Sequence, residues 1–304
     1  SAASDVYKRQ LHDSVYARAL VMEIGNMRVA QVSVDLVNFY SDRVANICKE
    51  KYGIMQLLIC ASHTHEDPNM ADARPREKKP DNTPFFEECI IKVVGEAIGN
   101  MFPARISAGT RTFPQLGFNR LIIRKDGKAR ESWVGDEHYN VENPERIPFG
   151  PVDPEVGVIK VEDMQGNARA IVMSYAMHAD LGCFSYEISA DYPGFACKKV
   201  EEAFDNKAIC LFVAGGGGNV EGLMISRRRS GPDDPIKTDY KPIQRTGELL
   251  GIEVIKLANA LHASSDNTSF KMRTDSLQFS TRGDKNRKAV SYTHLRAHET
   301  DSYL

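Results

Sequence analysis

Two histidines separated by one residue follow a short apolar run and could bind a metal ion. The run at residues 57–60 (LLIC) predicts a buried strand, and the polar segment SHTHED begins two residues later. Side chains two positions apart on a strand point to one face, so His63 and His65 should point together beyond the carboxyl end of the strand. Imidazole is the commonest metal-ligating side chain. The alternative is two polar residues at a strand exit, one of which caps a loop.

Two further strand candidates end in residues that could join this site. His178 follows a predicted strand at residues 168–175, and four glycines followed by Asn219 and Glu221 come after a predicted strand at 208–214. Ligands of open α/β sheets bind at the carboxyl ends of strands, so these residues would converge if the strands share a sheet. Two or three histidines with a carboxylate would form a zinc shell that leaves one position for water.

The other polar candidates each have a structural alternative. The glycine run lacks the Lys-Ser/Thr of a phosphate loop and the G-x-G-x-x-G spacing, so it indicates backbone that approaches a ligand, amide donors for an oxyanion, or a tight turn. Arg120 could clamp an anion or a carbonyl, or lie on a surface loop. Asp35 and Asp191 could orient histidines or cap elements, and the three arginines at 227–229 indicate a solvated turn.

The order of predicted elements indicates an α/β fold of mixed sheets with flanking helices, built of βαβ units and antiparallel hairpins. Hairpins are expected over 15–36, with a turn at Gly25, and over 156–175. Ser41 and Gly53 should bound a helix. Residues 70–83 should form a loop over the site, and the long irregular stretch 114–154 is typical of functional loops. The remaining expected helices begin near 83, 192 and 244, and the remaining expected strands are 104–112 and 274–281.

Composition narrows the class of partner. The formal net charge of −2 over 304 residues gives no reason to expect nucleic acid or an anionic membrane as partner. No apolar run approaches the length of a transmembrane helix. Six cysteines without C-x-x-C spacing indicate buried free thiols rather than a disulfide framework. A small-molecule substrate is therefore expected, and neither the compartment nor the oligomeric state follows from the sequence.

Both ends of the chain differ in character from the rest. Residues 1–10 and 289–304 have no clear period and resemble translated sequencing-adaptor read-through, so we expect the domain to occupy residues 11–288. On this interpretation the H-x3-H pair of His294 and His298 is not a zinc site, and the gene is cut at both ends.

The order of motifs resembles that of the N-terminal catalytic domain of neutral/alkaline (non-lysosomal) ceramidases. The resemblance covers residues 11 to about 261. It rests on the first hairpin and then on SHTHEDPN, FNR at 118–120, DPEVGVIKV from Asp153, SYAMHAD around His178, SADYPGFA and FVAGGGGNV.

This resemblance implies a zinc-dependent amidohydrolase of sphingolipid metabolism that cleaves the N-acyl bond of ceramide, a lipid amide. Carried over by position, His63 and His178 would bind zinc, and His65 and Arg120 would hold the reacting oxygens. The family's other two ligands, a Glu and a Tyr, lie later in the chain and have no match before Ala289. We therefore expect this chain alone to bind zinc weakly and to have little or no activity of its own.

Two departures from the family pattern leave the chemistry open. Glu221 stands where ceramidases have the serine held to be the nucleophile, and Glu66-Asp67-Pro68 replaces the usual Ser-Gly-Pro. Glu221 could act as a general base on a zinc-bound water, with Asn219 beside it as a further candidate catalytic residue. The alternatives are a metal hydrolase of a different ester, phosphoester or sugar substrate, and a homologue that binds a ligand without catalysis.

Overall fold

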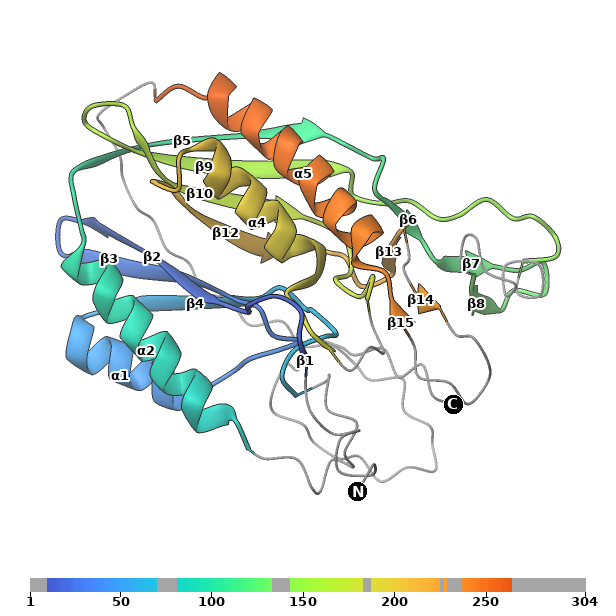
Figure 1. Cartoon of the computed structure of the whole chain (residues 1–304), viewed down its shortest axis with the longest axis horizontal. Coiled ribbons are helices and arrows are strands. Elements are labelled where there is room, and N and C mark those ends of the chain that lie inside the picture. The colour runs from blue at the N-terminus through green and yellow to red at the C-terminus, as the bar shows by residue number, and fades with distance from the viewer. Residues whose placement is uncertain are drawn as a thin grey trace.

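Two β-sheets, each covered by a pair of helices, form the body of the molecule (Figure 1). The computed structural model describes residues 10–69, 81–132, 143–182, 187–224, 227–228 and 237–263. In Figure 1, α1 and α2 lie on one side of the sheet of β2, β3 and β4, and α4 and α5 lie over the sheet of β5, β9, β10 and β12. Each sheet has its own cluster of buried apolar side chains. The predicted α/β class with mixed sheets and flanking helices is confirmed.

The three-stranded sheet follows the predicted hairpin and βαβ unit. Strand β2 (Ala17–Ile24) pairs antiparallel with β3 (Met27–Val34), which pairs in parallel with β4 (Gln56–Ala61). Helix α1 (Asp42–Tyr52) makes the crossover, and α2 (Thr83–Gly99) packs on β2. Ser41 Oγ accepts a hydrogen bond from the Val44 amide at 3.2 Å, and Gly53 adopts the left-handed φ of 66° that ends α1. Both predicted caps are therefore confirmed.

The prediction that residues 57–60 form a buried strand is wrong in one respect. They do form β4, but β4 is an edge strand, and Leu58 is 50% exposed. A short apolar run predicts a strand without saying whether both of its faces will be covered.

The four-stranded sheet has the order β12-β10-β9-β5. Strands β5 (Ala104–Thr112) and β9 (Glu155–Asp163) are antiparallel, as are β9 and β10 (Ala168–Tyr175), whereas β10 and β12 (Ile209–Ala214) are parallel. Helix α4 (Asp191–Ala203) connects β10 to β12, and α5 (Tyr240–Ala260) packs closely on α4. A Cβ at Gly247 would lie 2.5 Å from the Tyr192 carbonyl oxygen, so the close approach of these helices requires glycine there.

Short strands complete the described structure: β1 (Gln10–Leu11), β6 (Gly117–Asn119), β7 (Leu121–Ile123), β8 (Ala129–Glu131), β11 (Glu187–Ile188), β13 (Val220–Gly222), β14 (Arg227–Arg228) and β15 (Lys237–Thr238). The expectation of a simple turn at 227–229 is wrong for its first two residues, which pair with β15. The stretch 114–154 contains three of these strands. The expected strand at 274–281 and most of the expected loop at 70–83 lie outside the described residues.

The free thiols predicted for the cysteines are confirmed within the described residues. All five cysteines described there are free thiols, and Cys48, Cys197 and Cys210 are buried. No described helix combines the length and the apolar character needed to cross a membrane.

The two sheets meet along β12, one of the two edge strands of the larger sheet. Ser33 Oγ on β3 donates a 2.7 Å hydrogen bond to the Phe212 carbonyl on β12, and the buried Arg18 on β2 lies 3.5 Å from Glu201 on α4. The three strands before the candidate residues therefore do not share one sheet, which was the condition from which convergence was inferred. Strand β4 belongs to one sheet, whereas β10 and β12 belong to the other.

Replacing Ser33 by Ala should lower the free energy of unfolding by about 1–3 kcal/mol, because the buried Phe212 carbonyl would lose its hydrogen-bond donor. Ser107→Ala is the matched control, since Ser107 Oγ is buried with no hydrogen-bond partner in the described structure. Denaturant unfolding of both variants checks this, and an equal loss in both would contradict it.

Candidate metal centre

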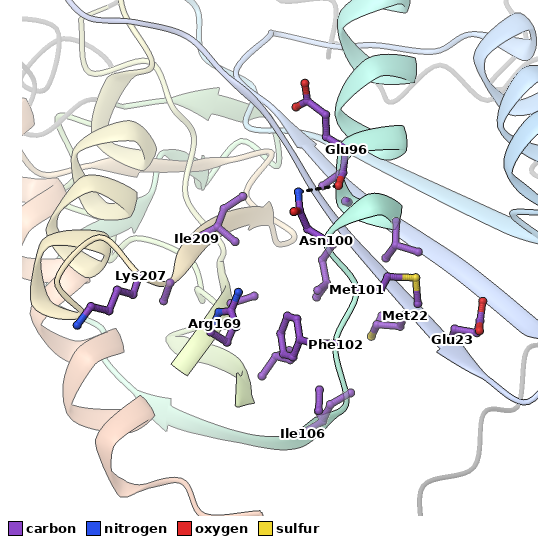
Figure 2. A pocket seen from close by; sticks show the side chains of 18 of the residues that line it. Met22, Glu23, Glu96, Asn100, Met101, Phe102, Ile106, Arg169, Lys207 and Ile209 are labelled. Carbon is purple, nitrogen blue, oxygen red and sulfur yellow. Dashed lines mark hydrogen bonds between the residues drawn. The ribbon is translucent and has the colours of Figure 1, made fainter. Parts of the chain in front are cut away.

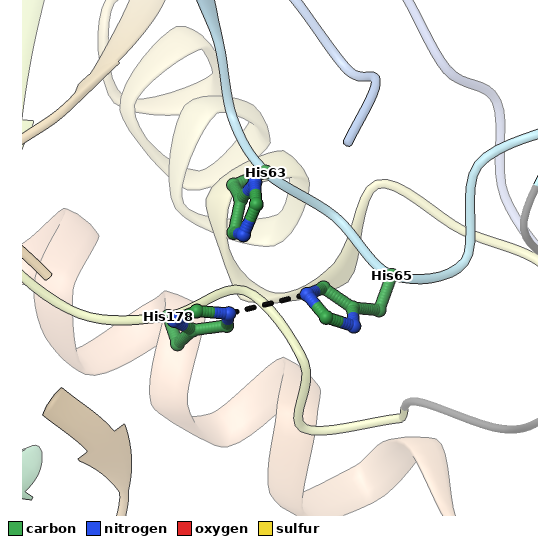
Figure 3. Close-up of side chains that lie close together, drawn as sticks. All are labelled: His63, His65 and His178. Carbon is green, nitrogen blue, oxygen red and sulfur yellow. Dashed lines mark hydrogen bonds between the residues drawn. The ribbon is translucent and has the colours of Figure 1, made fainter. Parts of the chain in front are cut away.

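Three imidazole rings from the two sheets converge at one point (Figure 3). One ring nitrogen from each of His63, His65 and His178 lies within 4.8 Å of the others. The Nε2 atoms of His65 and His178 are 3.1 Å apart. Zinc–nitrogen bonds of about 2.0–2.1 Å in a tetrahedral shell separate two ligand nitrogens by about 3.3 Å. The cluster could therefore hold a single metal ion of this size.

The chain turns sharply after β4 to place His63. Its φ is +66°, an uncommon conformation for a residue with a side chain, and its amide donates to the Leu36 carbonyl at 3.0 Å. Backbone of this kind is concentrated at functional sites. His63 and His65 lie beyond the end of β4, so the expected common direction is confirmed, but strand alternation is the wrong reason for it.

Contacts across the junction of the sheets hold the His65 segment. The His65 amide donates to the Ala179 carbonyl at 3.0 Å, and Thr64 Oγ1 donates to the Ser189 carbonyl at 2.9 Å. The buried Asp67 accepts a hydrogen bond from the Val37 amide at 2.9 Å. The segment after β4 is thereby attached both to its own sheet and to the segment after β10.

The glycine run positions His178. A Cβ at Gly217 would lie 2.8 Å from the Met177 amide nitrogen, and one at Gly215 would lie 3.1 Å from Ala176 Cα. The His178 amide donates to the Val220 carbonyl at 2.8 Å. The glycines do allow a close backbone approach, but what approaches them is the protein's own chain just before His178, whereas the approach to a ligand stays a prediction.

Backbone carbonyls orient two of the three rings. His63 Nδ1 lies 2.6 Å from the Val37 oxygen, and His178 Nδ1 lies 3.4 Å from the Gly217 oxygen. A carbonyl only accepts hydrogen bonds, so each Nδ1 is assigned the hydrogen and each Nε2 keeps its lone pair. Burial lowers the pKa of His178, and the nearby His63 and Arg120 lower it further, against the opposing effect of Asp180. The lowered pKa favours the neutral form of His178, which is the form that binds a metal.

Arg120 and Glu221 form a buried ion pair beside the histidines. Strands β6 and β13 pair antiparallel, with Glu221 opposite Phe118, and Arg120 follows β6 directly. Arg120 Nη1 contacts Glu221 Oε1, and Arg120 Nε lies 3.4 Å from Glu131. The Arg120 side chain is only 9% exposed and that of Glu221 is fully buried, so the surface-loop alternative for Arg120 is wrong. Asn219 contributes its carbonyl, which accepts from the Arg120 amide at 2.8 Å.

Three buried acidic groups lie near the histidines, and only Asp191 among them was given a role from the sequence. Glu66, Asp180 and Asp191 are each at most 3% exposed. Tyr240 Oη donates to Glu66 at 2.7 Å, and Asp191 accepts from the Gly182 and Tyr192 amides. Burial raises the pKa of Asp191 well above its usual value, and the charge of Glu66 raises it further. Glu66 directly follows His65, and Asp180 lies two residues after His178, so their positions in the sequence could have identified them as parts of the site.

The two aspartates expected to orient histidines contact other groups instead. Asp35 accepts from the Tyr16 amide at 2.9 Å and from Arg18 at 3.2 Å. The hydrogen bonds described for Asp191 join it to backbone amides. For both residues the orienting role was the wrong alternative, because carbonyls from Val37 and Gly217 stand where the carboxylates were expected.

Fold and site together define an α/β protein with two helix-covered sheets and a histidine cluster where strands of both sheets end. No protein family model matches the chain. Among solved structures it is similar to neutral ceramidase from Pseudomonas aeruginosa, with 18% identity, a TM-score of 0.60, and coverage of 84% of this chain and 40% of that one. A ceramidase complexed with C2 gives 18% identity, a TM-score of 0.61, and coverage of 84% and 39%.

The similarity confirms the ceramidase resemblance at the level of the fold. The chain spans about 40% of the length of the ceramidase chains it matches. At 18% identity the similarity shows a shared fold. The chemistry of this chain depends on the residues of its own site.

Replacing Gly217 by Ala should displace the segment that carries His178. We expect a loss of about 1–3 kcal/mol in unfolding free energy, because the added Cβ would overlap backbone atoms. Zinc affinity should fall about 10- to 100-fold, the range for positioning residues around a metal. Gly216→Ala is the matched control, since its Cβ would meet nothing within 4 Å. Equal behaviour of the two variants in calorimetry and zinc titration would refute the assignment.

The raised pKa of Asp191 predicts a specific pH dependence of stability. The folded protein keeps a proton that the unfolded chain releases above about pH 3.9, so the contribution of this group to the unfolding free energy falls as pH rises. Glu66→Gln removes the neighbouring charge and should make that fall smaller. Urea unfolding between pH 4 and 7 (about the range of this titration) measures the difference. Glu202→Gln, on the exposed side of α4, is the control, and identical profiles for wild type and Glu66→Gln would contradict the prediction.

Proposed function

We propose that this chain carries the metal centre of a zinc-dependent hydrolase of the neutral ceramidase-like type, which cleaves an N-acyl amide bond. The observation that carries the proposal is the convergence of His63, His65 and His178 at the ends of strands from two sheets. It is supported by a fold shared with proteins described as ceramidases. A lipid amide is the substrate class that this likeness suggests.

His63 and His178 are the proposed zinc ligands, because carbonyl-bound Nδ1 atoms direct their Nε2 atoms into the cluster. His65 Nε2, 3.1 Å from His178 Nε2, is close enough to complete the shell or to hold a reacting oxygen. Bound zinc would lower the pKa of a water to about 7 and polarise the scissile carbonyl. The lowered pKa of His178 keeps its lone pair available at neutral pH.

Arg120 is the proposed group that binds the carbonyl oxygen of the substrate. Its guanidinium is held by Glu221 and Glu131, and its charge lies close enough to His178 to lower the pKa of that ring. A fixed cation directed at developing negative charge stabilises the transition state without reorganising during the reaction. Asn219 supports this arrangement through its carbonyl, which accepts from the Arg120 amide.

Glu221 has two possible roles in this mechanism. A base role requires a carboxylate that accepts a proton readily, whereas an adjacent guanidinium stabilises the charged form and weakens the base. Its contact with Arg120 therefore favours a positioning role. The base role stays a prediction, since it requires Glu221 to exchange its arginine contact for a water during the reaction.

The same ion pair favours a second candidate function, a ligand-binding homologue without catalysis. A buried carboxylate at the position of the family's serine cannot supply a hydroxyl nucleophile. A metal hydrolase acting on a different ester or sugar-type substrate also fits an arginine that can clamp an oxyanion.

Replacing His63 by Ala should reduce zinc affinity at least about 100-fold. Removing a metal ligand lowers affinity more than removing a residue that only orients a ligand, which costs about 10- to 100-fold. Hydrolysis of a fluorogenic N-acyl amphiphile should disappear in parallel. His262→Ala is the control, since this histidine is exposed beyond α5. Zinc titration by calorimetry and product release by fluorescence are the measurements.

The outcomes separate the alternatives. Normal zinc binding by the His63→Ala protein would remove the metal assignment. Zinc binding by the wild-type protein without turnover on any amide, ester or glycoside of a substrate panel would favour the ligand-binding homologue.

A further inference from the structure

A groove lies between the two sheets at the end opposite the histidines (Figure 2). Its walls come from β2, from the connection between α2 and β5, and from the amino-terminal ends of β10 and β12. His178 follows the carboxyl end of β10, so the groove and the metal centre lie at opposite ends of the same strands. The volume of about 730 Å³ is within the range of small-molecule sites in proteins.

The groove is mainly apolar and partly open to water. Val21, Phe102 and Ile106 contribute to its wall, and at its opening Met101 is 38% exposed and Ile209 is 36% exposed. The sheets are joined near Ser33 and Phe212, and apolar side chains from both line the groove where it opens. Covering exposed apolar surface of this kind with the apolar part of a ligand lowers the free energy and so favours binding.

One cation is held at the opening of the groove. The Arg169 guanidinium lies over the Phe102 ring, 4.4 Å from its centroid, and the side chain is 40% exposed. Stacking of this type fixes the plane of the guanidinium. Its ion pair with Asp163 is long, at 3.9 Å, and Asp163 already accepts hydrogen bonds from Asn167. Most of the hydrogen-bonding capacity of Arg169 therefore faces the groove and the solvent.

The acidic side chains of the lining have cationic partners of their own. Glu23 is paired with Arg28, and Glu96 lies 3.6 Å from Lys92. Glu201 lies 3.5 Å from Arg18 and accepts from the Cys210 amide. Lys207 also lines the groove, but it is exposed and lies 3.7 Å from Asp205, so Arg169 is the cation that the groove presents to a ligand.

We propose that this groove is a second ligand site, which binds an amphiphilic anion such as a long-chain carboxylate. The apolar tail lies between the sheets against Val21 and Phe102, and the carboxylate forms parallel hydrogen bonds with Arg169 at the opening. This site is independent of the proposed hydrolase function, because it shares no residue with the histidine cluster.

Calorimetric titration with sodium dodecanoate tests the proposal. Arg169→Gln should weaken binding about tenfold, the loss of one charge-assisted contact, while Lys198→Gln, an exposed change on α4 outside the lining, should leave it unchanged. Ala104→Trp places a large ring in the groove from an exposed position of the lining and should also weaken binding.

Three results would overturn the proposal. The first is the absence of dodecanoate binding to the wild-type protein, and the second is binding that withstands both Arg169→Gln and Ala104→Trp. The third is binding that Arg169→Gln leaves intact but His65→Ala abolishes, which would place the ligand at the metal centre instead. None of these results affects the zinc titrations of His63→Ala, so the two proposals are judged separately.

Discussion

The candidate metal centre depends on how two separate sheets are joined. His63 and His65 follow a strand of the smaller sheet, whereas His178 follows a strand of the larger one. Ser33 bonds to the Phe212 carbonyl at the junction, and the His65 amide bonds to the Ala179 carbonyl beside the site. A shift of a few ångströms between the sheets would separate the imidazole nitrogens beyond the reach of one ion.

The charged side chains buried around this junction lie in small groups, in which a neighbouring ion or a proton balances each charge. Arg120 and Glu221 form one such group, and Asp191 with Glu66 forms another, in which burial and the charge of Glu66 raise the pKa of Asp191 and so favour its neutral form. Isolated buried charges would be costly, so each group is stable only while its partners stay in place. This makes the geometry around the histidines rigid, and rigidity is what a preorganised site requires.

The local elements could be predicted because short-range patterns specify them. Each of these features depends only on residues a few positions apart in the sequence, as in the hairpin turn near Gly25, the cap at Ser41 and the left-handed Gly53. The partition of the strands into two sheets could not be predicted in this way, since it depends on which apolar faces pack together across more than 100 residues. The exposure of Leu58 shows the same limit for a single strand.

The sequence by itself determined the candidate ligands and the ends of the strands that carry them, because residue type and apolar periodicity are local properties. Tertiary structure alone decided that three imidazoles meet, that Arg120 is buried against Glu221, and that Asp35 and Asp191 serve other groups. The physical reason is that these contacts join segments that are far apart in the chain. Their geometry is set by how the sheets pack and how tightly the glycine run approaches the backbone before His178.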